Sequence, residues 1–234
     1  MELMKTMVQR MMSVAFAAVM SLVVASAAWA ASTPGPYEVV SDTTKRVTKV
    51  IEEARSYVDE DPERFYGEVE KILADVVDFP SFARGVMGKY GSKRYYDTLS
   101  PEEKAKFRGR VERFTKTFQD RLIRTYAKGL LAFDGNRIEV LPIAKDAADE
   151  RSVNVEQHIF GNAPQPYVVY YKLTQNREGE WKLRNVSIEG VNLGRTYQSQ
   201  FASSARRFNG DIDKVIENWE VTPEGGLAEV AEES

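Results

Sequence analysis

The sequence predicts an α+β fold in which a curved antiparallel sheet of about four strands has helices packed over one face. Residues 42–130 place apolar side chains at helical spacing, residues 137–189 alternate with a period of two, and later residues return to helical spacing. Helices, then a meander, then helices are typical of an α+β domain. We expect the sheet and helices to enclose an apolar cavity, although a closed core fits the same pattern.

The first thirty residues have the features of an export signal. Lys5 and Arg10 precede a short apolar run, and Ala28-Trp29-Ala30 fits a cleavage site. The run is too short to span a membrane comfortably, and the expected location is the bacterial periplasm. The predicted organisation is a signal peptide at 1–30, a single domain at 31–221 and an acidic disordered tail at 222–234.

Composition excludes several functions. The chain has no cysteine, so disulfides, thiol catalysis and cysteine-bound metals are absent, and its one histidine cannot build a His-rich metal site. Loss of the signal peptide changes the formal net charge from −3 to −4, because Glu2, Lys5 and Arg10 leave with it. Such a mildly acidic exported protein is not a credible nucleic-acid binder. We expect a monomer without metal or cofactor.

Two segments carry strong signals for the start of a helix. Asp61-Pro62 combines an N-cap with proline at the first helical position. Ser100-Pro101-Glu102-Glu103 adds a capping box, in which Ser100 and Glu103 satisfy each other's backbone donors. After a loose leader at 32–36, we expect helices at about 42–57, from 62 to the break at Asp78, at 82–87 and at 100–130.

The strand region should form an antiparallel meander, and its last strand should bend. Strands are expected near 137–143, 151–160, 167–174 and 180–189. In the last one the apolar positions change parity, from Trp181 and Leu183 to Val186 and Ile188. A strand that shifts phase in this way needs a bulge, here near Arg184-Asn185. The chain then turns into a helix that carries Tyr197 and Phe201.

No catalytic motif stands out. His158 alternates with apolar positions of its strand and shares a face with Asn154 and Glu156, which is most simply the solvated side. The sequence contains no nucleophile elbow, metalloprotease helix or phosphate-binding glycine loop. A bent sheet can still hold a base in an apolar pocket, so an enzyme stays an alternative.

The helix expected at 100–130 has two notable faces. One face is narrow and rich in phenylalanine, and it fits either ordinary core packing or the wall of a cavity. The other is basic and fits either a solvated surface or a docking surface for head groups or an acidic partner. Its residues are Lys106, Arg110, Arg113, Arg121, Arg124 and Lys128.

Several motifs, in order and spacing, resemble a known family. They are Asp78-Phe79 with Phe82, the run Val86 to Tyr90, Leu99 to Glu103 leading to Phe107 and Phe114, and above all Trp181 to Leu193 followed by Tyr197 and Gln200-Phe201. Residues 38–220 resemble the MlaC family of periplasmic phospholipid-binding proteins, also called the toluene-tolerance auxiliary family. Where position 90 has Tyr, the family pattern has Trp as often.

The resemblance implies a non-catalytic soluble carrier that holds phospholipid acyl chains between helices and sheet. It also implies transfer between an outer-membrane lipoprotein–porin complex and an inner-membrane MCE-domain ABC transporter, which maintains outer-membrane lipid asymmetry. The alternatives are a small apolar-pocket enzyme of the bent-sheet isomerase type and a ligand-free periplasmic adaptor.

The candidate site residues are inferred from the pattern, because the family has no sharp lipid-contact motif. The predicted cavity lining is Phe79, Phe82, Phe107, Phe114, Phe118, Val155, Val169, Tyr171 and Ile188. The predicted docking residues are Arg110, Arg113, Arg121, Arg124 and Lys128. We expect a charge at Phe118 to abolish lipid retention without unfolding the protein.

Overall fold

The computed structural model describes residues 33–131, 137–143, 150–161 and 165–222. From Pro34 onward, these residues belong to one compact unit. The predicted signal peptide at 1–30 and all but the first residue of the predicted tail lie outside the described residues.

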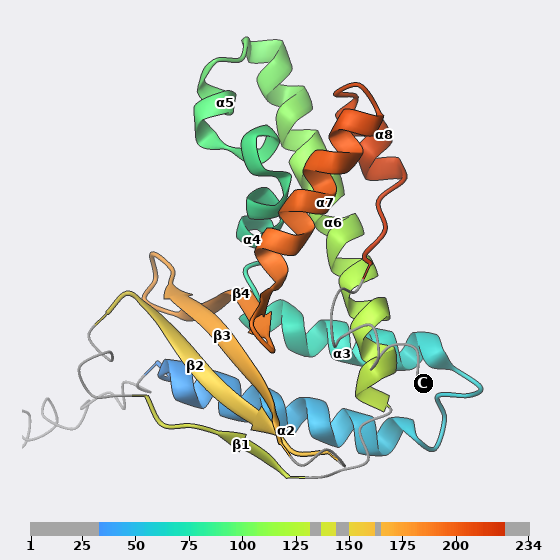
Figure 1. Ribbon diagram of the computed structural model, residues 1–234, viewed down its shortest axis with the longest axis vertical. Coiled ribbons are helices and arrows are strands. Elements are labelled where there is room, and N and C mark those ends of the chain that lie inside the picture. Colours follow the sequence, from blue (N-terminus) through green and yellow to red (C-terminus); the bar gives the residue numbers. More distant parts are fainter. Residues whose placement is uncertain (1–32, 132–136, 144–149, 162–164, 223–234) are drawn as a thin grey trace, which may run out of the picture. The chain divides into compact units, whose positions relative to one another are not determined.

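The architecture is helical, then a sheet, then helical again (Figure 1). The helices before the sheet are α2 (Pro36–Ala54), α3 (Pro62–Val76), α4 (Phe79–Met87), the 3₁₀ helix η1 (Gly88–Gly91), α5 (Lys93–Asp97) and α6 (Pro101–Leu131). The strands are β1 (Ile138–Val140), β2 (Ser152–Ile159), β3 (Tyr167–Gln175), β4 (Trp181–Ile188) and β5 (Val191–Asn192). The last helices are α7 (Leu193–Arg207) and α8 (Ile212–Glu217).

The sheet is an antiparallel meander with strand order β1-β2-β3-β4-β5. The predicted α+β class and antiparallel sheet are confirmed. The fifth strand is only two residues long and pairs with the end of β4. It was not expected, because two residues are too few to show a period of two.

The predicted start signals act as expected in α3 and α6. Asp61 accepts a hydrogen bond from the backbone N–H of Arg64. The capping box at α6 is complete: the Ser100 N–H donates to the Glu103 carboxylate at 2.8 Å, and the Glu103 N–H donates to the Ser100 hydroxyl at 3.3 Å. Both helices therefore begin where local hydrogen bonding predicts.

Two other helices begin earlier than predicted. Helix α2 begins at Pro36, inside the expected leader, because proline is tolerated in a first turn. Helix α4 begins at Phe79, three residues before the expected start. Asp78 is its N-cap rather than a break, since its carboxylate accepts from the Ser81 N–H at 3.0 Å.

The predicted bulge in β4 is confirmed. Lys172 of β3 lies opposite Asn185, whereas the next residue, Leu173, lies opposite Leu183, so Arg184 is the extra residue. The bulge keeps Trp181 and Leu183 on the same side of the sheet as the later Val186 and Ile188. All four are buried or half-buried there.

The sheet buries one face against two groups of helices. Helix α2 contacts β1 and β2, and in Figure 1 it runs along the sheet. The sheet–α2 cluster consists of Val40, Val153, Val155, Leu173 and Trp181. The larger helical cluster is built mainly by α3, α4, α6, α7 and α8, and Leu183, Val186 and Ile188 of β4 pack against it.

Candidate functional site

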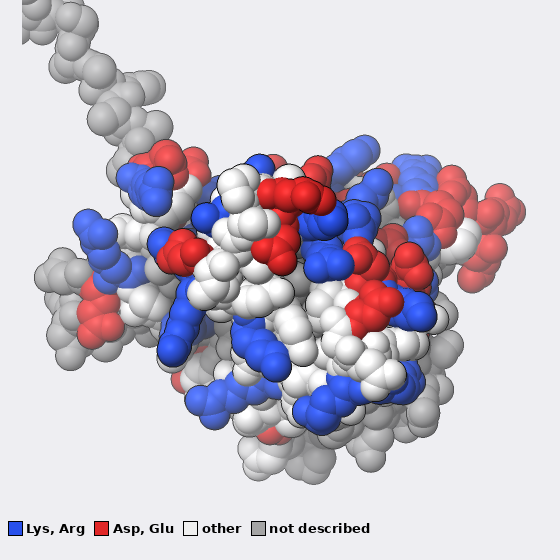
Figure 2. Space-filling model, turned by 90° about the horizontal axis from the view of Figure 1, so that it is seen from above, with Lys and Arg blue, Asp and Glu red and all other residues white. Residues whose placement is uncertain are grey.

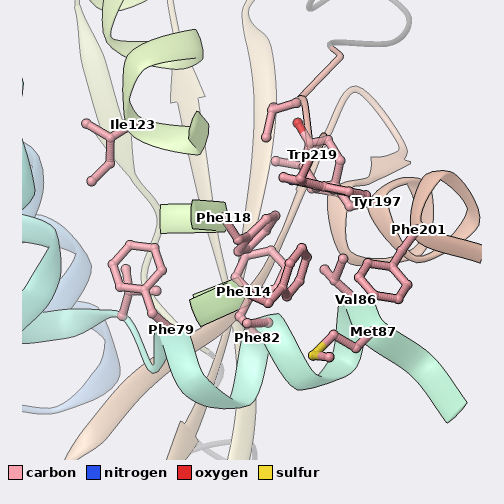
Figure 3. Close-up of a cluster of buried hydrophobic side chains, with 14 of the residues drawn as sticks. Phe79, Phe82, Val86, Met87, Phe114, Phe118, Ile123, Tyr197, Phe201 and Trp219 are labelled. Atoms are coloured by element: carbon pink, nitrogen blue, oxygen red, sulfur yellow. The ribbon is translucent and has the colours of Figure 1, made fainter. Parts of the chain in front are cut away.

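Four of the predicted lining residues meet in the helical cluster. Phe79 and Phe82 come from α4, and Phe114 and Phe118 come from α6 (Figure 3). The rings of Phe82 and Phe118 are 5.2 Å apart, and those of Phe114 and Phe118 are 5.7 Å apart. All four side chains are buried. The two helices thus present one continuous aromatic surface.

Helix α7 covers this surface. Tyr197 packs edge-on against Phe118 at 5.7 Å, and Phe201 packs edge-on against Phe114 at 4.9 Å. Trp219, which follows α8, contacts both Phe114 and Phe201. The stretch after the β4 bulge therefore returns its aromatic face onto α4 and α6.

The burial of Phe118 bears on the expected effect of a charge at this position. Its side chain is 0% exposed and is surrounded by aromatic rings. A charge at this position would be buried without a partner, which is strongly unfavourable. We therefore expect a charged residue here to destabilise the fold.

Phe107 lies apart from the other phenylalanines. It is near the start of α6, two helical turns before Phe114, and its ring contacts those of Tyr95 and Tyr96. It lines a shallow pocket of about 60 Å³ together with Tyr90, Tyr95, Leu99, Glu103, Lys106, Arg110 and Ile212. Pockets for drug-sized ligands measure roughly 300–1,000 Å³, so this one is too small for an acyl chain.

The predicted sheet residues are divided between the two clusters. Val155 belongs to the sheet–α2 cluster and Tyr171 packs against it, whereas Ile188 packs against the helical cluster. Val169 lies between them, because it is opposite Gln157 of β2 on one side and Ile188 of β4 on the other. The inner face of β3 therefore joins the two apolar regions. The predicted cavity itself stays a prediction.

A polar group missed by the sequence analysis lies within the sheet–α2 cluster. The side chain of Gln157 is 3% exposed. It accepts a hydrogen bond from the Tyr171 hydroxyl at 2.8 Å and donates one to the Thr44 hydroxyl of α2 at 2.7 Å. Burial raises the pKa of Tyr171 and keeps the phenol neutral. Gln157 shares the parity of Val153 and Val155, which is the signal that could have revealed it.

The bulge residue of β4 connects the sheet to the helical cluster. The Arg184 guanidinium lies 2.9 Å from the carboxylate of Asp78, which also caps α4. The Asp78 N–H donates to the Leu183 carbonyl at 2.9 Å. Both contacts join Asp78 to neighbouring residues at the bulge. The bulge therefore holds β4 against the start of α4.

Five residues of the basic face of α6 are paired with carboxylates, four of them with carboxylates from other parts of the chain. Arg110 and Arg113 both bind Asp213 of α8, and Arg124 binds Glu63 of α3 at 2.5 Å. Arg121 lies 3.5 Å from Glu220, and Lys106 lies 3.1 Å from Glu102. The side chain of Lys128 is not among those that the structure describes. The pairs with Asp213 and Glu63 connect α6 to α8 and α3, and a docking role for this face stays a prediction.

His158 lies on the outer face of the sheet, as expected. Its Nε2 is 2.7 Å from Glu156, and its ring packs against Phe160. In the described part of the chain, no group of three or more His, Asp or Glu side chains could hold a metal ion. Within the same residues, no helix is both long enough and apolar enough to cross a bilayer.

Comparison with known proteins agrees with this arrangement. The model of the MlaC protein family matches residues 41–221. The toluene tolerance protein ttg2D of Pseudomonas putida is 30% identical over 184 residues, which are 79% of each chain. The intermembrane phospholipid transport system binding protein MlaC of Haemophilus influenzae is 24% identical over 160 residues, which are 68% of this chain and 69% of that protein.

A solved structure has the same fold. It is the phospholipid-binding protein from Ralstonia solanacearum in complex with a phospholipid, which aligns with a TM-score of 0.65 at 20% sequence identity. The alignment covers 86% of this chain and 98% of that one.

Fold and site together define an α+β protein whose antiparallel sheet buries one face against an aromatic helical cluster. The chain belongs to the MlaC family, because the family model matches most of its length. The resemblance drawn from the sequence motifs is thereby confirmed.

Proposed function

We propose that this protein is a soluble periplasmic phospholipid carrier that holds acyl chains in its apolar interior. The proposal rests on family membership, because the Haemophilus influenzae relative is named as an intermembrane phospholipid transport system binding protein. The described interior supports it, because the inner face of the sheet and the helical cluster are both built from apolar side chains.

The energetics of transfer favour such a carrier. Burial of one CH₂ group contributes about 0.8 kcal/mol, so exposing one acyl chain to water costs on the order of 10 kcal/mol. An apolar protein interior removes most of this cost and offers the chain an environment similar to a bilayer. Transfer is then nearly balanced in free energy, and its direction depends on the partners rather than on chemistry in this chain.

The junction at Val169 is the best candidate for the position of the chains. There the sheet–α2 cluster and the helical cluster meet on the inner face of β3. Acyl chains inserted at this junction would contact Phe79, Phe82, Phe114 and Phe118 from the helices and Val155, Val169, Tyr171 and Ile188 from the sheet. Phe107 lies apart from this junction, at the far end of α6. A head group left in solvent would be selected weakly.

Export by a cleaved signal peptide at residues 1–30 and function in the periplasm are part of the proposal. The proposed partners are an inner-membrane MCE-domain ABC transporter complex and an outer-membrane lipoprotein–porin complex. Lipid exchange between them would maintain outer-membrane asymmetry. The chain needs no metal or cofactor for this role, and its phospholipid is cargo.

The enzyme alternative gains only partial support. It expects a buried tyrosine or carboxylate with a shifted pKa, and Tyr171 is half-buried with a pKa that desolvation raises. Its hydroxyl, however, is bound to Gln157, and the pocket described above is lined by other residues. A tyrosine with a raised pKa is also a poor base near neutral pH.

Mass spectrometry of an organic extract from the purified exported protein tests the proposal. We expect a stoichiometric amount of phospholipids that share acyl chains but differ in head group. A protein that carries no lipid and takes up none from vesicles would refute the carrier function and favour the ligand-free adaptor. Intact mass of the same sample shows whether residues 1–30 have been removed.

A further inference from the structure

A basic and aromatic surface lies at one end of the helical bundle. We call it the tip and define it as residues 88–108, which form η1, α5 and the first turns of α6. In Figure 1 the tip is at the end of α6 that is farther from the sheet. Figure 2 looks onto this end and shows Lys and Arg side chains standing around uncharged surface, with acidic side chains gathered along part of the face.

The tip has more basic than acidic residues, although the whole chain is acidic. It contains six Lys and Arg and three Asp and Glu, whereas the formal net charge of the whole chain is −3. All three carboxylates are already engaged. Asp97 pairs with Lys93 at 2.5 Å, Glu102 pairs with Lys106 at 3.1 Å, and Glu103 completes the capping box of α6.

Four cations of the tip are left without a carboxylate among the described residues: Lys89, Arg94, Lys104 and Arg108. Two of them lie over tyrosine rings instead. Lys89 is 4.8 Å from the ring centre of Tyr90, and Lys104 is 5.3 Å from that of Tyr96. Arg108 donates a hydrogen bond to the Tyr96 hydroxyl at 3.0 Å. Their positive charge is therefore available to an external anion.

One aromatic residue of the tip is exposed, whereas Tyr90, Tyr96 and Phe107 are half-buried. The side chain of Tyr95 is 41% exposed, although its ring packs on Tyr90 and Phe107. Tyrosine with an apolar ring and a wet hydroxyl is enriched at the level of lipid head groups, and Lys and Arg extend from apolar stems to the same level. The adjoining pocket of about 60 Å³ suits surface contact better than uptake of a chain.

We propose that the tip docks this protein on the surface of an anionic phospholipid bilayer. The positive charge complements anionic head groups, and Tyr95 contacts the interface between head groups and chains. Each Lys or Arg near such a surface strengthens binding roughly fivefold, so four unpaired cations give weak and reversible docking. The inference rests on the proposed function in one respect, since a lipid carrier has to approach a membrane.

Vesicle flotation with the exported protein tests the docking surface. Vesicles of phosphatidylethanolamine with phosphatidylglycerol provide the anionic surface, and phosphatidylcholine vesicles provide the zwitterionic control. The tip variant combines Lys89→Gln, Arg94→Gln and Arg108→Gln. The matched control combines Lys71→Gln, Lys116→Gln and Arg177→Gln, which are exposed and lie on α3, mid-α6 and the β3–β4 turn.

We expect flotation with anionic vesicles at low salt and little with phosphatidylcholine or at high salt. The tip variant should bind roughly 100-fold more weakly, and the matched control should bind nearly as well as the unaltered protein. Tyr95→Ser should weaken binding severalfold, whereas Tyr170→Ser, with 40% exposure on the sheet, should not. Unaltered circular dichroism of each variant verifies its fold.

Three outcomes would overturn the inference. They are failure of the unaltered protein to float with anionic vesicles, equal binding to both kinds of vesicle, and equal losses in the tip and control variants. The first outcome would favour an acidic protein, rather than a bilayer, as the partner that binds the tip. Lipid content, measured in each variant by mass spectrometry, separates the two proposals, because lipid-free protein that still floats would refute the carrier and not the docking surface.

Discussion

The guanidinium of Arg184 lies 2.9 Å from the carboxylate of Asp78, so the bulge residue of β4 is bound to the N-cap of α4. Asp78 is about four-fifths buried, and its backbone N–H also donates to Leu183. Asp78 therefore caps α4 and also binds β4, through Arg184 and Leu183. The bulge is required for this contact, because a regular strand has no extra residue to turn toward the helix.

Substitution of Asp78 separates the cap from the ion pair. Asp78→Asn keeps a good N-cap and removes the charge, and we expect it to lower the free energy of unfolding by about 1 kcal/mol. Asp78→Ala removes both interactions and should cost about 2 kcal/mol. Urea denaturation measures both values. Equal costs for the two variants would show that the cap adds nothing to stability, and an unaltered stability of Asp78→Asn would show the same of the ion pair.

Truncation of Phe118 tests the solid packing of the helical cluster. The side chain is fully buried against Phe82, Phe114 and Tyr197, so Phe118→Ala should lower the free energy of unfolding by about 3–5 kcal/mol. Phe107→Ala is the comparison, because Phe107 is only half-buried, and its cost should be clearly smaller. Similar costs at the two positions would contradict the burial described here.

The contact between Gln157 and Tyr171 can be measured by a double-mutant cycle. Tyr171→Phe leaves the buried Gln157 carbonyl oxygen without its donor, which should cost about 1–3 kcal/mol. Adding Gln157→Leu removes the orphaned group, so the double variant should lose less than the two single variants together. Strictly additive costs in urea denaturation would show that the two side chains do not interact.

The Asp213 carboxylate gives the stability a component that depends on acid pH. Hydrogen bonding to Arg110 lowers the pKa of Asp213 below its ordinary value of 3.8. A lowered folded-state pKa means that this stabilisation is present above about pH 4 and is lost as the pH falls through the folded-state pKa. Because the carboxylate is 40% exposed, its contribution is at most about 1 kcal/mol.

Asp213→Asn should therefore be less stable than the unaltered protein at pH 7 and equally stable near pH 2. Thermal unfolding across this range measures the difference. A difference that stays constant down to pH 2 would mean that the substitution acts through packing rather than charge. Asp42→Asn, at an exposed site on α2, is the control for removal of a surface carboxylate.

Local features of the chain were predictable because they depend on near neighbours. The cap at Asp61 and the box at Ser100 and Glu103 use hydrogen bonds within three residues. The bulge at Arg184 was predictable because the apolar positions change from odd to even numbers within the eight residues of β4. The MlaC family was also recognisable, because its motifs are short and occur in a fixed order.

The tertiary structure decided which of the apolar residues share a cluster. Phe107 and Phe114 lie on the same face of α6, yet only Phe114 reaches the buried aromatic cluster, because α7 covers that part of the helix and not its first turns. The basic face of α6 looked free in the sequence, but distant chain segments supply its partners, such as Asp213, one hundred residues after Arg113. Periodicity determines the face on which a side chain lies, and only packing determines what that face meets.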